Sequence, residues 1–149
     1  MTIYHEKLWP APWLFISTAL VIPASLLVFL PINPVVGVVV AVALYLAIVG
    51  LLILASPVVA VTSTEFIAGK ARLPLSVVGD VTAHRADDAR AERGPNLDAR
   101  AWLLIRGWID PVIRVQLVDE KDPTPYWLVS TRRPEDLAAA LEKSRASRA

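Results

Sequence analysis

Cysteine is absent from the chain, which excludes disulfides, thiolate nucleophiles and cysteine-ligated metal ions. Histidine occurs only at His5 and His84, and the six glycines are isolated from one another. A phosphate-binding loop needs clustered glycines, so this class of nucleotide site is excluded too. The sequence therefore predicts no cofactor and no metal site.

Charge is missing from two long stretches near the N-terminus. Residues 13–30 and 35–61 contain no Asp, Glu, Lys or Arg. As helices they would reach roughly 27 and 40 Å, compared with about 30 Å for the hydrocarbon core of a bilayer. Two adjacent runs of this kind favour membrane helices over a buried core helix. The first run is followed by "PINP" rather than by a signal-peptide cleavage site, so we predict an uncleaved hairpin.

Prolines and small residues refine the hairpin, which we place at 13–57 with helices at 13–30 and 35–57. Pro23 should kink the first helix, and Pro57 should end the second. Gly37 with Ala41, and Ala43 with Ala47, are small residues four apart that permit close helix contact. Packing within the hairpin is the favoured use of these positions, while a homo-oligomer stays open.

The distribution of basic residues predicts the orientation. Lys7 precedes the first span, and the other 14 of the 15 Lys and Arg residues follow the second. Two spans place both termini on one side, and the positive-inside rule puts that side in the cytoplasm of a plasma-membrane protein. Residues 1–12 are predicted to lie at the membrane interface, anchored by the side chains of Tyr4, Lys7, Trp9 and Trp13.

Residues 58–149 change to short runs of β-forming residues and are predicted to be a cytoplasmic domain. In 111–120, Ile113 and Val115 share one face and Arg114 lies on the other, as in a half-buried antiparallel strand. The polar segment 85–100 is predicted to be a loop with at most one helical turn. The predicted strands are two within 58–75 joined at Gly69, then 76–84, 101–109, 111–120 and 126–131.

A C-terminal helix should begin near Pro134. Proline is favoured in the first helical turn, and Glu135 and Asp136 would lie at the positive end of the helix dipole. Leu137 and Leu141 form an apolar stripe that can lie on a sheet, whereas residues 142–149 are polar and should fray. The whole pattern predicts a membrane α-helical hairpin plus an α+β domain.

Two resemblances follow from these stretches. A hairpin leading into about six antiparallel strands and a closing helix that begins "RPEDL" resembles bacterial membrane proteins with a pleckstrin-homology-like domain, over residues 58–146. That resemblance implies an antiparallel split barrel closed by the C-terminal helix. The stretches "YHEKLWPAPW", "RGPNLDARAWLL" and "DPTPYWLVSTRRPEDLAAAL" also resemble a family of two-span actinobacterial membrane proteins defined by a domain of unknown function. That family implies a membrane location and supplies no catalytic residue.

Several arginines are candidate contacts for anionic lipid or a protein partner. A solvated surface with ordinary charge pairing is the alternative for all of them. For Arg132 and Arg133 we favour bridging the corner before the last helix. The turns at 93–100 and 119–126 would either cross-pair to stiffen the domain or recognise a partner. The candidates are Arg93, Arg100, Arg114, Arg132 and Arg133.

Other chemistry has little support. His84 lies near Asp87 and Asp88, but this cluster opens a charged loop and has no second histidine in the domain. From residue 62 onward the chain has 14 basic and 13 acidic residues. It therefore lacks the excess of positive charge that binding to the phosphates of a nucleic acid requires. Trp102, Trp108 and Trp127 are expected in a sheet core rather than as stacking platforms.

The sequence thus predicts a non-catalytic scaffold that presents a cytoplasmic domain at the plasma membrane, with membrane lipid and an unidentified protein as partners. The alternative is an accessory or regulatory subunit of a lipid or cell-envelope enzyme or transporter. A small enzyme acting on lipid headgroups through His84 is the third hypothesis.

Overall fold

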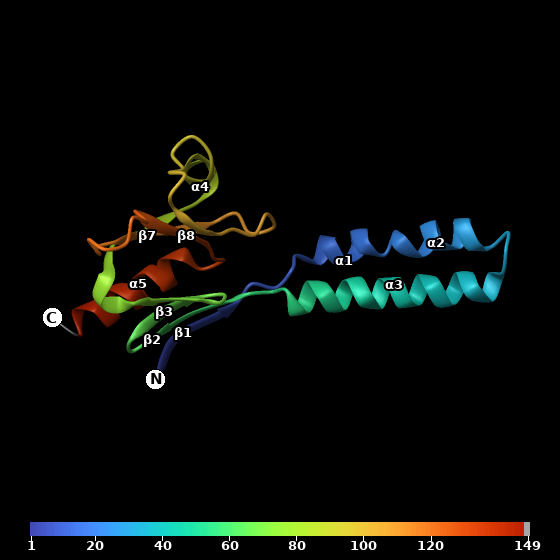
Figure 1. Cartoon of the computed structure of the whole chain (residues 1–149), viewed down its shortest axis with the longest axis horizontal. Helices are drawn as coiled ribbons and strands as arrows, with labels where there is room; N and C mark the ends of the chain where they lie inside the picture. The colour runs from blue at the N-terminus through green and yellow to red at the C-terminus, as the bar shows by residue number, and fades with distance from the viewer. Residues whose placement is uncertain (148–149) are drawn as a thin grey trace. The chain divides into compact units, whose positions relative to one another are not determined.

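The computed structural model describes residues 1–147 of the chain, which divide into two units (Figure 1). Unit 1 consists of Met1–Leu8 and the described residues from Pro57 onward, and unit 2 of Trp9–Ser56. Unit 2 is thus an insertion in the sequence of unit 1. Each unit is described separately below.

Unit 2 is the apolar helical hairpin, with helices α1 (Pro12–Thr18), α2 (Val21–Phe29) and α3 (Pro34–Leu54). Two helical segments, Pro12–Phe29 and Pro34–Leu54, have mean hydropathies of 2.0 and 2.9 and are long and apolar enough to cross a membrane. They match the predicted spans closely, although α3 ends at Leu54, three residues before Pro57. Few of their side chains are buried inside the structure, so the hairpin exposes its apolar surface.

The first helical segment is interrupted between α1 and α2, where Pro23 was expected to kink it. Proline has no N–H for the carbonyl of the residue four positions earlier, and its ring crowds that carbonyl. The residue four before Pro23 is Ala19, whose oxygen instead accepts from the N–H of Ile22, three residues on, at 3.0 Å. The break at Ala19 and Leu20 follows from this local tightening.

The hairpin turn is capped by Asn33, whose Oδ1 accepts from the backbone N–H groups of Val35 (2.9 Å) and Val36 (3.3 Å). Gly37 and Ala41 are the buried residues of α3. A Cβ on Gly37 would lie 3.2 Å from Cβ of Phe29, so the glycine permits close packing on α2. The predicted use of these two positions within the hairpin is confirmed.

Unit 1 contains a first four-stranded antiparallel sheet in the order β1-β2-β3-β4. Gly69 makes the β3–β4 turn with a φ of +62°, which only glycine adopts freely. A second turn, at residues 63–64, divides the segment predicted as one strand before Gly69; Oγ1 of Thr62 accepts there from the Glu65 N–H at 2.9 Å. The strands are β1 (Thr2–Lys7), β2 (Val58–Thr62), β3 (Glu65–Ala68) and β4 (Ala71–Pro74).

The second sheet has the order β5-β7-β8-β6, with β6 parallel to β8 and the other pairs antiparallel. A short 3₁₀ helix, η1 (Leu75–Val77), precedes it. A strand was predicted over residues 101–109, but the observed strand ends at Leu104, where the chain leaves the sheet. The strands are β5 (Val78–His84), β6 (Trp102–Leu104), β7 (Val112–Leu117) and β8 (Tyr126–Ser130).

The main core of unit 1 contains side chains of both sheets and of α5 (Pro134–Ala146). The Trp127 ring centroid lies 6.0 Å from that of Phe66 and 4.2 Å from that of Trp102. Leu137 and Leu141 of α5 are fully buried in the same core, so the predicted start and apolar stripe of this helix are confirmed. The helix continues to Ala146, and residues 148–149 of the predicted frayed tail lie outside the described residues.

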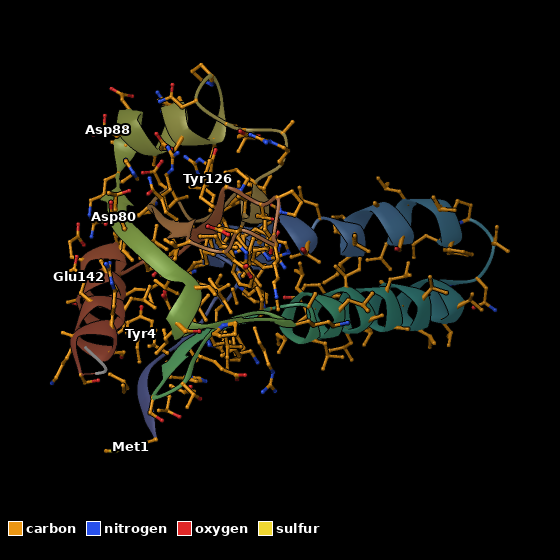
Figure 2. All side chains as sticks on the ribbon, turned by 60° about the vertical axis from the view of Figure 1, so that its left-hand side comes forward. Met1, Tyr4, Asp80, Asp88, Tyr126 and Glu142 are labelled. Atoms are coloured by element: carbon orange, nitrogen blue, oxygen red, sulfur yellow. The ribbon has the colours of Figure 1, made fainter. Side chains whose placement is uncertain are left out.

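A second small core lies beside α4 (Ala86–Arg93) and contains Ala89, Val112, Tyr126 and Leu128. The prediction of a loop at 85–100 is therefore wrong for residues 86–93. Asp87 and Asp88 in the first turn and Arg90 and Arg93 in the last complement the helix dipole. Asp88 of α4 and Glu142 of α5 point away from the protein interior (Figure 2).

Residues 2–7 form β1 rather than an interfacial lead. This strand pairs with β2 across some fifty residues of sequence, and Tyr4 and Glu6 on its inner face are buried. Tyr4 is therefore part of the unit 1 interior and cannot be a membrane anchor in this fold. Trp9 and Trp13 belong to unit 2 and are exposed, so their anchoring role stays a prediction.

The described residues of unit 1 form two separate sheets and no closed barrel. Eight strands replace the roughly six that were predicted, because β1 lies in the segment predicted as an interfacial lead and the turn at residues 63–64 divides one predicted strand into β2 and β3. The coarser expectation of two apolar helices followed by an α+β part is confirmed.

Candidate functional site

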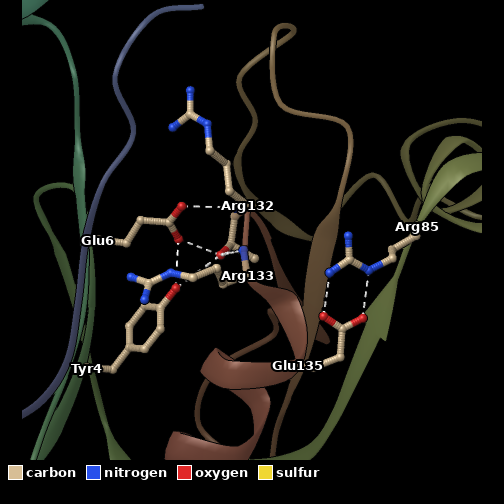
Figure 3. A network of polar contacts seen from close by, with 7 residues as sticks. Tyr4, Glu6, Arg85, Arg132, Arg133 and Glu135 are labelled. Carbon is tan, nitrogen blue, oxygen red and sulfur yellow. Dashed lines mark hydrogen bonds and ion pairs between the residues drawn. The ribbon is translucent and has the colours of Figure 1, made fainter.

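A buried polar cluster joins the N-terminal strand to the corner between β8 and α5 (Figure 3). Glu6 is 7% exposed, and its carboxyl group accepts from three donors. The Tyr4 hydroxyl donates to Oε2 at 2.8 Å, the Thr131 hydroxyl donates to the same oxygen, and the Arg132 backbone N–H donates to Oε1 at 3.0 Å. The acid is thus fully engaged by groups of unit 1.

Alternation along β1 explains one half of this cluster, since Tyr4 and Glu6 are two apart and face the same side. The other half comes from the sharp corner that precedes Pro134. The Thr131 hydroxyl there accepts from the Arg133 N–H at 3.2 Å while it donates to Glu6. One carboxyl group therefore holds the first strand and the last corner together.

Arg133 completes this cluster from the outside. Its guanidinium lies 5.0 Å from the centre of the Tyr4 ring, and its Nη2 donates to the His5 carbonyl at 3.2 Å. The Arg133 side chain thus connects the corner to β1, and the carboxyl group at the corner is that of Glu6, which the Arg132 backbone N–H contacts. Arg132 contributes its backbone to the cluster, and its guanidinium reaches beyond Glu6 (Figure 3).

Burial raises the pKa of the Tyr4 hydroxyl from 10.0 to about 12, with Glu6 adding to the effect. Because the folded pKa exceeds the unfolded one, the folded state binds the proton more tightly. Stability from this group is therefore complete below pH 10 and lost as the pH rises from about 10 to about 12.

Tyr4→Phe should abolish this alkaline loss. Over that interval the free energy of unfolding of the wild type should fall by about 2 kcal/mol more than that of the variant. Denaturant titrations of the full chain in detergent at several pH values measure the difference, with Tyr45→Phe in unit 2 as control. Parallel pH profiles for wild type and Tyr4→Phe would contradict the assignment.

Beside this cluster, Arg85 pairs with Glu135 in the first turn of α5. Nε of Arg85 donates to Oε1 of Glu135 at 2.7 Å, and Nη2 contacts Oε2. These bonds lower the pKa of Glu135 from 4.5 to about 2, and they raise that of Arg85. The pair connects the end of β5 to the start of α5 on an exposed surface.

A second polar cluster lies beneath α4 and accounts for Arg114. Its Nη1 donates to Oε2 of Glu92 at 3.0 Å, and its guanidinium lies 3.9 Å from the centre of the Tyr126 ring. Glu92 is buried and also accepts from Asn96 at 3.3 Å. Arg114 is thus placed in a contact between α4 and the sheet, not on an open surface for lipid.

The other candidate arginines pair with nearby acids. Arg93 donates to Asp110 at 3.1 Å, and Arg100 donates to Asp98 at 3.0 Å, which lowers the pKa of Asp98. The two predicted turns do meet, but through Tyr126, whose hydroxyl accepts from the Asp98 N–H at 2.8 Å. Cross-pairing through charged side chains of both turns is not seen among the described contacts.

His84 makes a local contact, with Nε2 2.9 Å from the Thr82 hydroxyl. Among residues 1–147, no group of three or more His, Asp or Glu side chains is arranged to hold a metal ion. Glu6 and Glu92, the buried acids of the two clusters, were not singled out from the sequence. In the sequence these two acids alternate with aromatic or apolar neighbours. Many solvent-exposed acids have the same pattern, so it does not predict burial.

A family model described as "Protein of unknown function (DUF3093)" matches residues 3–141, nearly the whole chain. No curated protein and no solved structure matches the chain significantly.

Proposed function

The chain belongs to the DUF3093 family of proteins of unknown function, and from its structure we propose an integral plasma-membrane protein. In this proposal the hairpin holds unit 1, a non-catalytic partner-binding module, at the cytoplasmic face. Three observations support it: the insertion point of the hairpin, the exposed apolar surface of unit 2, and the buried acids of unit 1, which hold its own elements together.

The insertion point of the hairpin is the observation that carries the proposal. Lys7 at the end of β1 pairs with Val58 at the start of β2, and the Leu8 N–H donates to the Pro57 carbonyl at 2.9 Å. The chain therefore leaves unit 1 and returns to it at adjacent positions. An insertion that crosses a membrane twice satisfies this geometry, whereas a single crossing would put β1 and β2 on opposite sides.

The surface of unit 2 supports a lipid environment. Soluble monomers rarely expose contiguous apolar patches of more than a few hundred Å². Both helical segments of unit 2 expose large apolar side chains along their length, and a bilayer would cover them. Examples are Ile16, Leu20, Leu27, Leu46, Leu51 and Leu54.

The basic residues decide the side of the membrane in this proposal. Lys70 and Arg72 follow the second span within about twenty residues, the distance over which Lys and Arg bias orientation. The turn between α2 and α3 contains neither Lys nor Arg. Unit 1 is therefore assigned to the cytoplasm and residues 30–33 to the outside.

A pleckstrin-homology-like fold remains our proposal for unit 1. Two four-stranded sheets share one core, and α5 contacts strands of both. The resemblance implies an antiparallel split barrel closed by a C-terminal helix. The position of α5 supports this proposal, whereas the two separate sheets and the parallel β6–β8 pair depart from it.

The partner-binding role is supported by how unit 1 uses its polar groups. The acids in its interior hold β1 to the corner and α4 to the sheet, which are structural tasks. Exposed apolar side chains at Leu103 and Val118 offer contact surface on a rigid scaffold.

Site-specific photo-crosslinking in living cells tests this role. A photoreactive amino acid at Leu103 or Val118 of the full chain should yield a crosslinked product with one other protein, recovered reproducibly. Lys143 on α5 supplies the exposed comparison position. An envelope enzyme or transporter as the product would favour an accessory subunit, and no protein product from any position would contradict the proposal.

A further inference from the structure

We propose that helix α4 is a removable cover, and that Arg114 beneath it binds a carboxylate in an acidic segment of a partner protein. In the closed arrangement the carboxylate of Glu92 on α4 occupies this place. The inference rests on the proposed function, because it names the chemistry of the partner that unit 1 binds.

The contact between α4 and the rest of unit 1 has little apolar surface. Helices α4 and α5 lie on opposite faces of the second sheet (Figure 1). Leu137 and Leu141 of α5 are fully buried, whereas the buried residues of α4 are only Ala89 and Glu92. An element that buries so few apolar groups can open locally while the rest of its domain stays folded.

Both ends of α4 are bound by one exposed acid. The Asp110 carboxylate accepts from the backbone N–H of Ala86 at 2.8 Å and from Arg93 at 3.1 Å. Its side chain is 53% exposed, and ion pairs at such sites contribute little to stability. The pair formed by Glu92 and Arg114 is therefore the main charged contact that keeps α4 closed.

The backbone at the start of α4 is strained. Ala86 has a φ of +49°, and it is the one residue other than glycine in the left-handed region within residues 1–147. For an L-residue this conformation is unfavourable by roughly 5- to 30-fold. Because the N–H of Ala86 is bound to Asp110 only while α4 is closed, opening relieves the strain.

Arg114 is incompletely paired in the closed arrangement. Its Nη1 donates to Glu92 at 3.0 Å, but its Nε is buried and has no hydrogen-bond partner in the described part of the chain. A carboxylate can accept from two nitrogens of one guanidinium, as Glu135 does from Nε and Nη2 of Arg85. A carboxylate that is not attached to α4 can bind Arg114 in this way, once α4 has left the buried Nε.

The surroundings of Arg114 suit a peptide rather than a small acid. Its guanidinium lies 3.9 Å from the centre of the Tyr126 ring. Val112 and Leu128 are buried under α4 beside it, and Leu103, which pairs with Leu128, is exposed already. Opening of α4 would thus present an arginine next to apolar surface, which matches a peptide with an acid between apolar residues.

Hydrogen–deuterium exchange of the full chain in detergent tests whether α4 opens by itself. Backbone amides of α4 should exchange at least tenfold faster than those of α5. Glu92→Gln should speed exchange in α4 at least tenfold, and Ala86→Gly, which removes the strain, should slow it about threefold. Equal exchange in α4 and α5, or either variant without its change in α4, would overturn the proposal.

Binding is measured by fluorescence anisotropy of fluorescein-labelled hexaglutamate with the full chain. Glu92→Gln removes the internal competitor and should lower the dissociation constant at least tenfold. Adding Arg114→Gln should abolish this gain. Ala86→Gly should raise the dissociation constant of the otherwise wild-type chain about threefold, an effect that stabilises the closed arrangement and that misfolding would not produce.

Two controls address charge and ligand size. Glu120→Gln removes the same charge from an exposed turn and should bind as the wild type does. Free glutamate at an equal carboxylate concentration should displace little of the peptide. The proposal is overturned if Glu92→Gln binds no more tightly, if Glu120→Gln gains as much, or if free glutamate displaces the peptide completely.

Photo-crosslinking at Leu103 in cells separates this inference from the proposed function. The yield of the partner product should rise in Glu92→Gln and fall in Ala86→Gly. A partner recovered equally from both variants and the wild type would overturn the cover and leave the partner-binding role intact. No protein product from Leu103 or Val118 would contradict that role, and the protein partner inferred here with it, whatever the binding of hexaglutamate.

Discussion

Glu6→Ala should lower the free energy of unfolding of unit 1 by about 4 kcal/mol. The variant leaves the Tyr4 hydroxyl, the Thr131 hydroxyl and the Arg132 N–H without their common acceptor. A buried polar group that loses its partner costs about 1–3 kcal/mol, and here three are affected at once. The loss should loosen β1 from the corner before α5.

Thermal unfolding of the full chain in detergent, followed by tryptophan fluorescence, measures this effect. For a unit of about 100 residues, the expected shift in Tm exceeds 10 °C. Glu6→Gln retains one acceptor oxygen and should cost less than half as much. Glu120→Ala, at an exposed turn, is the control and should change Tm little. A shift below 3 °C for Glu6→Ala would show that the cluster does not hold β1.

Glu92→Ala should cost about 2 kcal/mol by leaving Arg114 without its carboxylate beneath α4. The Arg114 side chain is 29% exposed and that of Glu92 is 9% exposed, so the cost should fall below the 3–5 kcal/mol of fully buried pairs. The paired variant Glu92→Leu with Arg114→Met should be milder than Glu92→Ala, because it removes both charges together.

A double-mutant cycle on the same two positions, read by chemical denaturation, gives their coupling energy. The exposed pair formed by Asp87 and Arg90 is the comparison, and it should show coupling of no more than about 0.5 kcal/mol. Equal coupling in the two pairs would show that Arg114 is a surface residue, as the sequence had allowed.

The hairpin could be predicted because its signals are local. Apolar composition over some twenty residues defines a span, and Pro23 perturbs the carbonyl four positions earlier. The start of α5 at Pro134 is local in the same sense. Such features need no knowledge of distant partners.

The site could not be predicted because its contacts are not local. Tyr4 and Glu6 become buried only when β1 pairs with β2 and packs against the corner near Thr131. This corner lies more than a hundred residues after β1 in the sequence. Alone, "IYHEKLW" has the aromatic and basic composition of a membrane interface. Helix α4 was missed for another reason. Its sequence is mostly polar, and Ala89 alone does not form the apolar stripe by which a helix is recognised.

The claim that two crossings separate the paired strands β1 and β2 can be tested by cysteine labelling, since the natural chain has no cysteine. Single cysteines are placed at Thr2, Ile32 and Glu120, all exposed, and treated with a membrane-impermeant maleimide in intact and in permeabilised cells. The account predicts that Ile32→Cys reacts in intact cells, whereas Thr2→Cys and Glu120→Cys react only after permeabilisation. Labelling of Thr2→Cys and Glu120→Cys from opposite sides of the membrane would contradict it.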